Sequence, residues 1–222
     1  MVAMSCKRSL TVVALVAATI ATPALGSGVG AQAGAPVLCG GLEVTVNLAA
    51  GEIPTSGDDV ILGTFGSDNI NALAGDDTIC GRNGNDNING GGGPDMINGR
   101  GGNDNIEGGV GDDVLLGAAG DDNVSGGTGD DVINGNNGFD NIEGNIGDDV
   151  IFGAAGDDVL DGGVGNDTLN GNRGFDRLTG REGDDLLFGL DGVDILNGGA
   201  GAFDQCEVDS ADIRRIACEV ET

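Results

Sequence analysis

The chain has 222 residues, a formal net charge of −28, 46 Gly, and neither His, Trp nor Tyr. This composition is far from that of an average globular domain, so we expect no conventional close-packed core. The absence of His excludes a histidine-dependent catalytic triad. The excess of 37 acidic over nine basic residues disfavours a nucleic-acid-binding protein.

Residues 1–33 have the pattern of an export signal. Lys7 and Arg8 give a basic start, Leu10–Ile20 is apolar, and Ala31-Gln32-Ala33 matches an A-x-A cleavage site. The apolar run is shorter than the ~20 residues of a membrane-spanning helix, so we prefer a cleaved signal to a membrane anchor. Cleavage after Gly26 is the alternative. Removal of two bases and no acid changes the net charge from −28 to −30, and the mature protein is expected to be secreted.

Residues 34–56 are predicted to form an N-terminal cap and linker. Within them, apolar and polar residues alternate as they do in a strand with one covered face. The apolar members are Leu42, Val44, Val46 and Leu48. We expect this strand to pack at the mouth of the repeat array that follows.

A nine-residue unit then repeats sixteen times without insertion from Gly57 to Ala200. Written from its first glycine the unit is G-x-D-x-U-x-G-x-x, where U is aliphatic, and we number its positions one to nine. Position one is Gly and position three is Asp in every copy, whereas position seven is Gly except at Ala72. A short period of this kind predicts a parallel solenoid in which each unit is one strand and one turn.

The aspartates at position three point to a bound cation. Stacked strands lie ~4.8 Å apart, so like carboxylates would repel one another along the array. A merely solvated position would tolerate Glu, yet Glu never occurs at position three. At the variable position two, by contrast, a solvated surface is a sufficient explanation for the aspartates Asp58, Asp76, Asp112, Asp130 and Asp148. Carboxylates and turn carbonyls form an all-oxygen environment, which favours Ca²⁺ over Mg²⁺.

Rotated to start at its paired glycines, as in residues 126–134, the unit is G-G-x-G-x-D-x-U-x. In this form it resembles the repeat-in-toxin (RTX), or haemolysin-type, calcium-binding repeat over residues 57–200. The resemblance implies an all-β fold, a parallel β-roll (β-solenoid) of about eight two-strand coils in which successive copies alternate between two sheets. It also implies calcium between turns two copies apart, held by two Asp side chains and by backbone carbonyls.

Carried over to this chain, the resemblance pairs Asp59 with Asp77, Asp68 with Asp86, and so on to Asp176 with Asp194. The candidate metal ligands are Asp59, Asp68, Asp77, Asp86, Asp95, Asp104, Asp113, Asp122, Asp131, Asp140, Asp149, Asp158, Asp167, Asp176, Asp185 and Asp194. These pairs give about fourteen Ca²⁺ ions, whose charge of about +28 nearly balances the mature chain. We therefore expect a chain that is disordered without calcium and folds on binding it.

The outward positions four and six support the alternation independently. In odd-numbered copies they are mostly apolar, as in Val114, Leu116, Val132, Val150, Phe152, Leu186 and Phe188, and in even-numbered copies they are mostly Asn or Glu. One sheet would thus present an apolar outer face and the other an asparagine-rich one. The apolar face is a hypothetical surface for self-association or for a protein or cell-surface partner.

Residues 201–222 are predicted to form a C-terminal cap, which repeat arrays need to shield their last coil. In this segment Asp204 comes one residue late relative to the repeat, which leaves its role as a ligand open. Ile213, Ile216 and Ala217 follow at helix-like spacing.

Four cysteines remain after signal removal, and their even number agrees with an oxidising destination. Of three pairings we favour Cys39 with Cys80 and Cys206 with Cys218, because each would tie one flank to one end of the array. A zinc site is the competing interpretation, which the absence of His and the wide spacing disfavour.

The sequence thus predicts a secreted calcium-binding β-roll that folds on binding its ions, without enzymatic activity. The alternative is a structural, adhesive or self-assembling surface protein in which calcium only stiffens the rod. Neither hypothesis involves nucleic acid or a membrane span.

Overall fold

The computed structural model describes residues 38–201, 203–207, 214–216 and 218. The predicted signal segment 1–33 lies outside these residues. Within the described ranges, no helix is long and apolar enough to cross a membrane. Helical structure there is a single short 3₁₀ helix, η1 (Leu48–Ala50).

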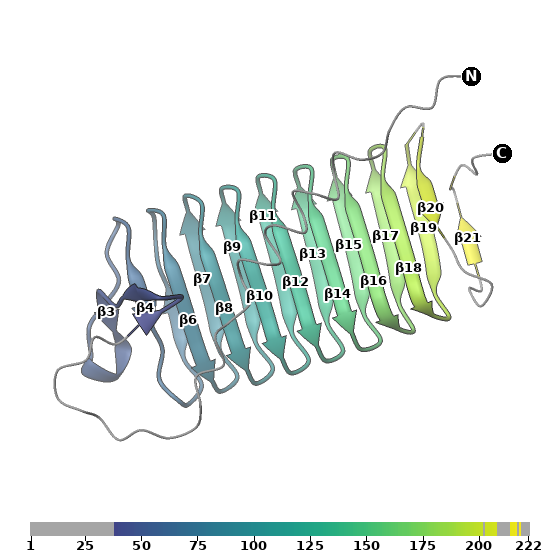
Figure 1. The fold of residues 1–222 in the computed structure, drawn as a ribbon. Coiled ribbons are helices and arrows are strands. Elements are labelled where there is room, and N and C mark those ends of the chain that lie inside the picture. Colours follow the sequence, from purple (N-terminus) through teal and green to yellow (C-terminus); the bar gives the residue numbers. More distant parts are fainter. Residues whose placement is uncertain (1–37, 202, 208–213, 217, 219–222) are drawn as a thin grey trace. The chain divides into compact units, whose positions relative to one another are not determined.

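Two sheets, each built of parallel strands, contain nearly all of the strands (Figure 1). The ten-stranded sheet has the spatial order β20 (Gln205–Glu207), β18 (Leu186–Gly192), β16 (Thr168–Gly174), β14 (Val150–Ala155), β12 (Val132–Asn137), β10 (Val114–Ala119), β8 (Met96–Gly101), β6 (Thr78–Asn83), β4 (Val60–Leu62) and β3 (Val46–Asn47). The nine-stranded sheet has the order β21 (Arg214–Ile216), β19 (Ile195–Ala200), β17 (Arg177–Glu182), β15 (Val159–Val164), β13 (Asn141–Ile146), β11 (Asn123–Thr128), β9 (Asn105–Val110), β7 (Asn87–Gly92) and β5 (Asn69–Asn71).

The strand pairing confirms the predicted parallel β-roll and its eighteen-residue coil. Val132 pairs with Val114 on one side and with Val150 on the other, and Asn123 pairs with Asn141. Odd-numbered copies form the ten-stranded sheet and even-numbered copies the nine-stranded one. The solenoid has about nine turns rather than about eight, because β3, β20 and β21 extend the sheets beyond the repeats.

The core consists of the position-five aliphatic residues of both sheets. From Ile61 to Leu196 they form one buried cluster, which Val46 and Leu48 close at one end and Cys206 at the other. Each coil contributes only two such side chains, so a coil buries little apolar surface by itself and depends on its neighbours.

The N-terminal cap differs from the single strand predicted over residues 42–48. Instead, β1 (Leu38–Cys39) and β2 (Leu42–Glu43) form an antiparallel hairpin, and β3 pairs with β4. The predicted disulfide between Cys39 and Cys80 is present, and these cysteines are buried with Leu62 on the outer face of the ten-stranded sheet. The chain must pass from this outer face to the end of the core, where Val46 is buried, and a single straight strand cannot do both.

The outer face of the ten-stranded sheet carries the apolar residues predicted for it. We expected Val114, Leu116, Val132, Val150, Phe152, Leu186 and Phe188 to be exposed, but Leu116 is buried and the others are half-buried. The register pairs Val114 with Val132 and Val132 with Val150, whereas Leu116 and Phe152 lie on either side of Asn134. Side chains of the neighbouring strands, apolar or polar, thus flank these residues and reduce their exposure.

The C-terminal cap is built from strands. β20 pairs with β18 so that Gln205 lies opposite Leu186, and β21 pairs with β19 so that Arg214 lies opposite Ile195. The helix-like spacing was therefore wrong for Arg214–Ile216, because the open sheet edge offers backbone partners that an isolated helical turn lacks. Residues 213 and 217 of that pattern lie outside the described residues. The predicted disulfide between Cys206 and Cys218 is present.

Candidate calcium sites

The position-three aspartates form two columns, one along each set of turns. Each Asp precedes the first residue of a strand, and partners within a column are eighteen residues apart, as Asp113 and Asp131 are. All sixteen are buried except Asp68, which is half-buried. The structure thus brings together the neighbours that the sequence paired.

One oxygen of each carboxylate joins consecutive coils. The backbone N–H of Asp113 donates to Oδ1 of Asp131 at 2.8 Å, and the N–H of Asp131 donates to Oδ1 of Asp149 at 2.8 Å. The same bond recurs from Asp59 with Asp77 to Asp176 with Asp194. Asparagine could accept this bond equally well, so it does not explain why position three is always Asp.

The second oxygen, Oδ2, explains that choice. In thirteen aspartates of the described chain it is buried and has no hydrogen-bond partner; these are Asp77, Asp86, Asp95, Asp104, Asp113, Asp122, Asp131, Asp140, Asp149, Asp158, Asp167, Asp176 and Asp185. Burying one unpaired charged oxygen costs several kcal/mol, so two columns of them cannot be accounted for by protein contacts alone. A bound cation would satisfy all of them.

The position-seven glycines form the wall that these oxygens face. A Cβ on Gly81 would lie 2.5 Å from Oδ2 of Asp86 and 2.9 Å from the carbonyl oxygen of Gly99, one coil further on. A Cβ on Gly126 would likewise lie 2.8 Å from the carbonyl oxygen of Gly144. The carboxylate and the carbonyl therefore converge on a space that a side chain would fill, which is why the repeat requires Gly here.

Burial and mutual repulsion both act on these carboxylates. Burial, opposed by the backbone hydrogen bond and reinforced by neighbouring aspartates, raises the pKa to about 7 for Asp95, Asp131, Asp158 and Asp167. For the same reasons the pKa is about 6 for Asp104, Asp113, Asp122, Asp149, Asp176 and Asp185. The pKa values of Asp77, Asp86 and Asp140 are raised as well. Without a counter-charge, the ladders are thus held in an environment that disfavours their charged form.

The donor set fits calcium. Among the described residues, no group of three or more His, Cys, Asp or Glu side chains comes together, so the carboxylates cannot form a site by themselves. Backbone carbonyls such as that of Gly99 must complete the set. An all-oxygen set of carboxylates and carbonyls is typical of Ca²⁺ and lacks the nitrogen and sulfur ligands that zinc prefers.

Two features of the turns were not predicted from sequence. Asp204 is buried and its Oδ1 accepts the N–H of Asp185 at 3.1 Å, so it continues the ladder although it comes one residue late. The position-two carboxylates are also more than a solvated surface: Oδ1 of Asp112 accepts the N–H of Asp130 at 3.0 Å. The ladder hydrogen bond between Asp185 and Asp204 spans nineteen residues, so the last coil contains one extra residue, for which a strict nine-residue period gives no signal.

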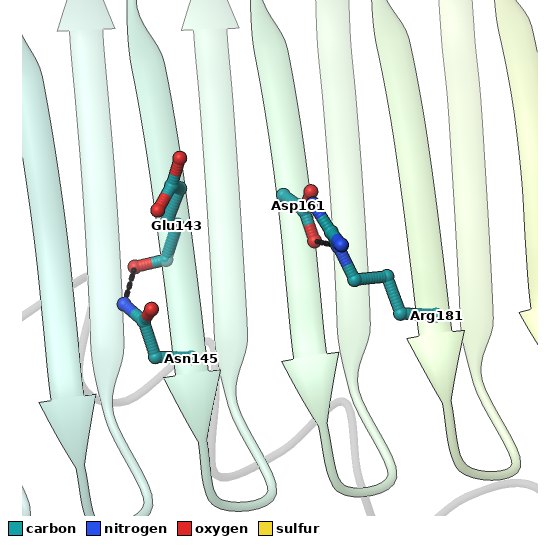
Figure 2. Close-up of polar contacts among 4 residues, drawn as sticks. All are labelled: Glu143, Asn145, Asp161 and Arg181. Atoms are coloured by element: carbon teal, nitrogen blue, oxygen red, sulfur yellow. Dashed lines mark hydrogen bonds and ion pairs between the residues drawn. The ribbon is translucent and has the colours of Figure 1, made fainter.

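A separate groove lies on the outer face of the nine-stranded sheet. It encloses about 1020 Å³ and is lined by residues including Glu107, Glu143, Asp161 and Arg181. Figure 2 shows that Arg181 forms an ion pair with Asp161 and that Asn145 donates to the backbone carbonyl of Glu143. The groove is open, unlike the buried ladders, which therefore remain the candidate metal sites.

Substitution of Gly108 by Ala should weaken calcium binding and destabilise the calcium-loaded fold, because its Cβ would overlap both Oδ2 of Asp113 and the carbonyl oxygen of Gly126. The matched control is Gly92→Ala, since a Cβ on Gly92 meets nothing within 4 Å. Thermal unfolding in saturating calcium should show a lower midpoint for Gly108→Ala and almost none of that loss for Gly92→Ala. Equal effects of the two substitutions would contradict the proposed convergence of ligands.

Comparison with known proteins adds the family. No curated protein matches the chain. The family model described as the RTX calcium-binding nonapeptide repeat matches residues 54–88, 81–115, 116–144, 134–169 and 170–202, more than half of the chain. With its eighteen-residue coils, aspartate ladders and glycine-lined turns, the chain belongs to the RTX calcium-binding nonapeptide repeat family.

Proposed function

We propose that this chain is a secreted calcium-binding protein whose repeats hold Ca²⁺ between stacked turns and whose fold forms on binding it. The observation that carries this proposal is the set of buried Oδ2 atoms without a protein partner. Membership of a calcium-binding repeat family supports Ca²⁺ as the cation.

The residues that would hold the ions are the aspartates of neighbouring coils and the carbonyls of the position-seven residues. For the turns that contain Asp113 and Asp131, these are Oδ2 of Asp113 and the carbonyl oxygen of Gly126, which both lie against the space beside Gly108. Bound calcium supplies positive charge that offsets the repulsion within the ladder. The protein itself supplies the spacing, through the bond from each Asp N–H to the next Asp Oδ1.

Secretion is proposed from two properties of the chain. The N-terminal sequence has the pattern of an export signal. The two disulfides agree with an oxidising compartment. The proposed role is binding rather than catalysis, and the chain has no His for a histidine-dependent reaction.

A second candidate is a structural or adhesive role in which calcium only stiffens the roll. It is favoured by the outer face of the nine-stranded sheet, where exposed asparagines form a regular ladder. Nδ2 of Asn105 donates to Oδ1 of Asn87 at 2.7 Å, and Nδ2 of Asn87 donates to Oδ1 of Asn69 at 3.2 Å. Retention of the protein on washed cells, with and without chelator, would distinguish the two roles.

Equilibrium dialysis of the mature chain against calcium tests the main proposal. We expect up to about fourteen bound ions, at most one for each pair of neighbouring ladder aspartates, and no comparable binding of Mg²⁺. Asp131→Asn should reduce the number of bound ions. Asp130→Asn, an adjacent exposed change of equal charge, should leave it unchanged. Absence of calcium binding at millimolar concentration would refute the proposed function.

A further inference from the structure

We propose that the first turn of each aspartate column is closed by protein donors instead of calcium, and that metal binding begins only beyond it. This inference rests on the proposed function. It assigns Thr55 and Thr64 as the groups that exclude the cation from Asp59 and Asp68.

The first carboxylate of one column is fully supplied with donors. Oδ2 of Asp59 accepts the backbone N–H of Thr55 at 2.7 Å and its hydroxyl at 3.0 Å. Oδ1 of Asp59 accepts the hydroxyl of Thr45 at 3.3 Å. Neither oxygen of this buried side chain needs a metal ion to satisfy it.

The first carboxylate of the other column has the same arrangement. Oδ2 of Asp68 accepts the N–H of Thr64 at 2.7 Å and its hydroxyl at 3.1 Å, and the same hydroxyl lies 2.9 Å from Oδ1. Thr55 and Thr64 each stand four residues before the Asp that they contact, so the two columns use one device.

No later turn of the described array has this arrangement. The residue four positions before each subsequent Asp is at position eight, and from Leu73 to Leu190 every such residue has φ between 70° and 118°. Thr55 and Thr64 do not have positive φ. Where the backbone is left-handed, Oδ2 of the following Asp has no donor in the aspartates from Asp77 to Asp185.

The next turn is intermediate between the first turns, which threonine closes, and the later turns, which leave space beside Oδ2. Position seven of the second copy is Ala72, which is fully buried, whereas every other copy has Gly there. A methyl group is thus present at the position where the later turns leave space beside Oδ2. The departures from the repeat are therefore concentrated at the N-terminal end of the ladders.

The N-terminal end also has the contacts that a metal-free turn requires. The disulfide from Cys39 to Cys80 ties the hairpin to β6 of the ten-stranded sheet, and Val46 covers Ile61 at the end of the core. A covalent bond and apolar packing thus provide what calcium would provide further along. A permanently closed first coil would give the remaining coils an edge to stack on.

Native mass spectrometry of the calcium-saturated mature chain, which resolves single ions, tests this inference. The double variant Asp59→Asn, Asp68→Asn should bind the same number of ions as the wild type. The matched variant Asp131→Asn, Asp140→Asn, which changes one Asp in each column further along, should lose at least two. Equal losses from both variants would overturn the inference and leave the proposed function intact. Absence of bound calcium in the wild type would overturn both.

A second pair of variants keeps the test independent of the aspartates. Thr55→Gly with Thr64→Gly removes both hydroxyl donors and permits the left-handed backbone of the later turns, so we expect up to two additional ions. Thr55→Ser with Thr64→Ser keeps the hydroxyls and should leave the number unchanged. An unchanged number in the glycine variant, with an intact calcium-loaded circular dichroism spectrum, would contradict the role of the threonines.

Discussion

Chelation of calcium should abolish most of the β-sheet circular dichroism of the mature chain, residues 34–222 with both disulfides intact. Without the ions, thirteen buried Oδ2 atoms in the described ladders have no partner, and each coil adds only two aliphatic side chains to the core. The cost of burying these charged oxygens, together with the conformational entropy lost when the chain is ordered, exceeds what nearest-neighbour stacking provides. Calcium should restore the spectrum cooperatively, because each coil folds against the next, with a midpoint of about 10⁻⁴ to 10⁻³ M.

Magnesium provides the control for this titration. Mg²⁺ requires near-ideal octahedral geometry and gives up its water reluctantly, so it should not replace calcium between the turns at the same concentration. A complete β spectrum in excess chelator would show that the solenoid stands without metal. In that case the unpaired carboxylates would need another explanation, and the structural alternative would be favoured.

Acidification should partly replace calcium. The pKa values of ten ladder aspartates are raised by burial to about 6 or 7 from the ordinary 3.8. Between pH 3.8 and about 7 the folded chain therefore binds more protons than the unfolded chain, so stability falls as pH rises through this interval. The metal-free chain should be most structured near pH 4 to 5 and lose that structure by pH 8.

The measurement is circular dichroism of the chelated chain between pH 5 and pH 8, kept dilute because the sequence pI is about 4.1. With calcium the dependence should reverse, since protonated carboxyl groups cannot bind the ion and acid then competes with it. The control is the variant Asp131→Asn, Asp140→Asn, whose uncharged side chains should reduce the loss of structure at pH 8. Metal-free structure that increases from pH 5 to pH 8 would contradict this account.

The architecture and the ladders were predictable because the repeat is strict. Asp lies at position three and an aliphatic residue at position five of every copy, so a slip by anything other than a whole copy would remove the aliphatic side chains, Ile61 to Leu196, from the core. The outward residues of odd and even copies differ, and this difference alone indicates an eighteen-residue coil. The disulfides of Cys39 with Cys80 and Cys206 with Cys218 were predicted from the position of the cysteines relative to the array, since each ties a flank to the nearer end.

The ends of the array were not predictable, because they are where the local pattern stops and tertiary contacts take over. The strand predicted over residues 42–48 divides because Val46 packs under Ile61 while Cys39 reaches the outer face at Cys80. Asp204 joins the ladder across nineteen residues instead of eighteen, which only the position of Asp185 reveals.

By itself the sequence determined the period, the inward side chains, the aspartate columns and the choice of a hard cation, all of which depend on residue type and spacing alone. Only the tertiary structure decided which carboxylate oxygens lack a donor. The sixteen repeat aspartates differ in whether Oδ2 has a donor, because Thr55 and Thr64 lie against the first Asp of each column, whereas later turns have a left-handed residue in their place. The physical reason is that a repeat specifies a coil between two neighbours, and an end coil must replace the neighbour that it lacks.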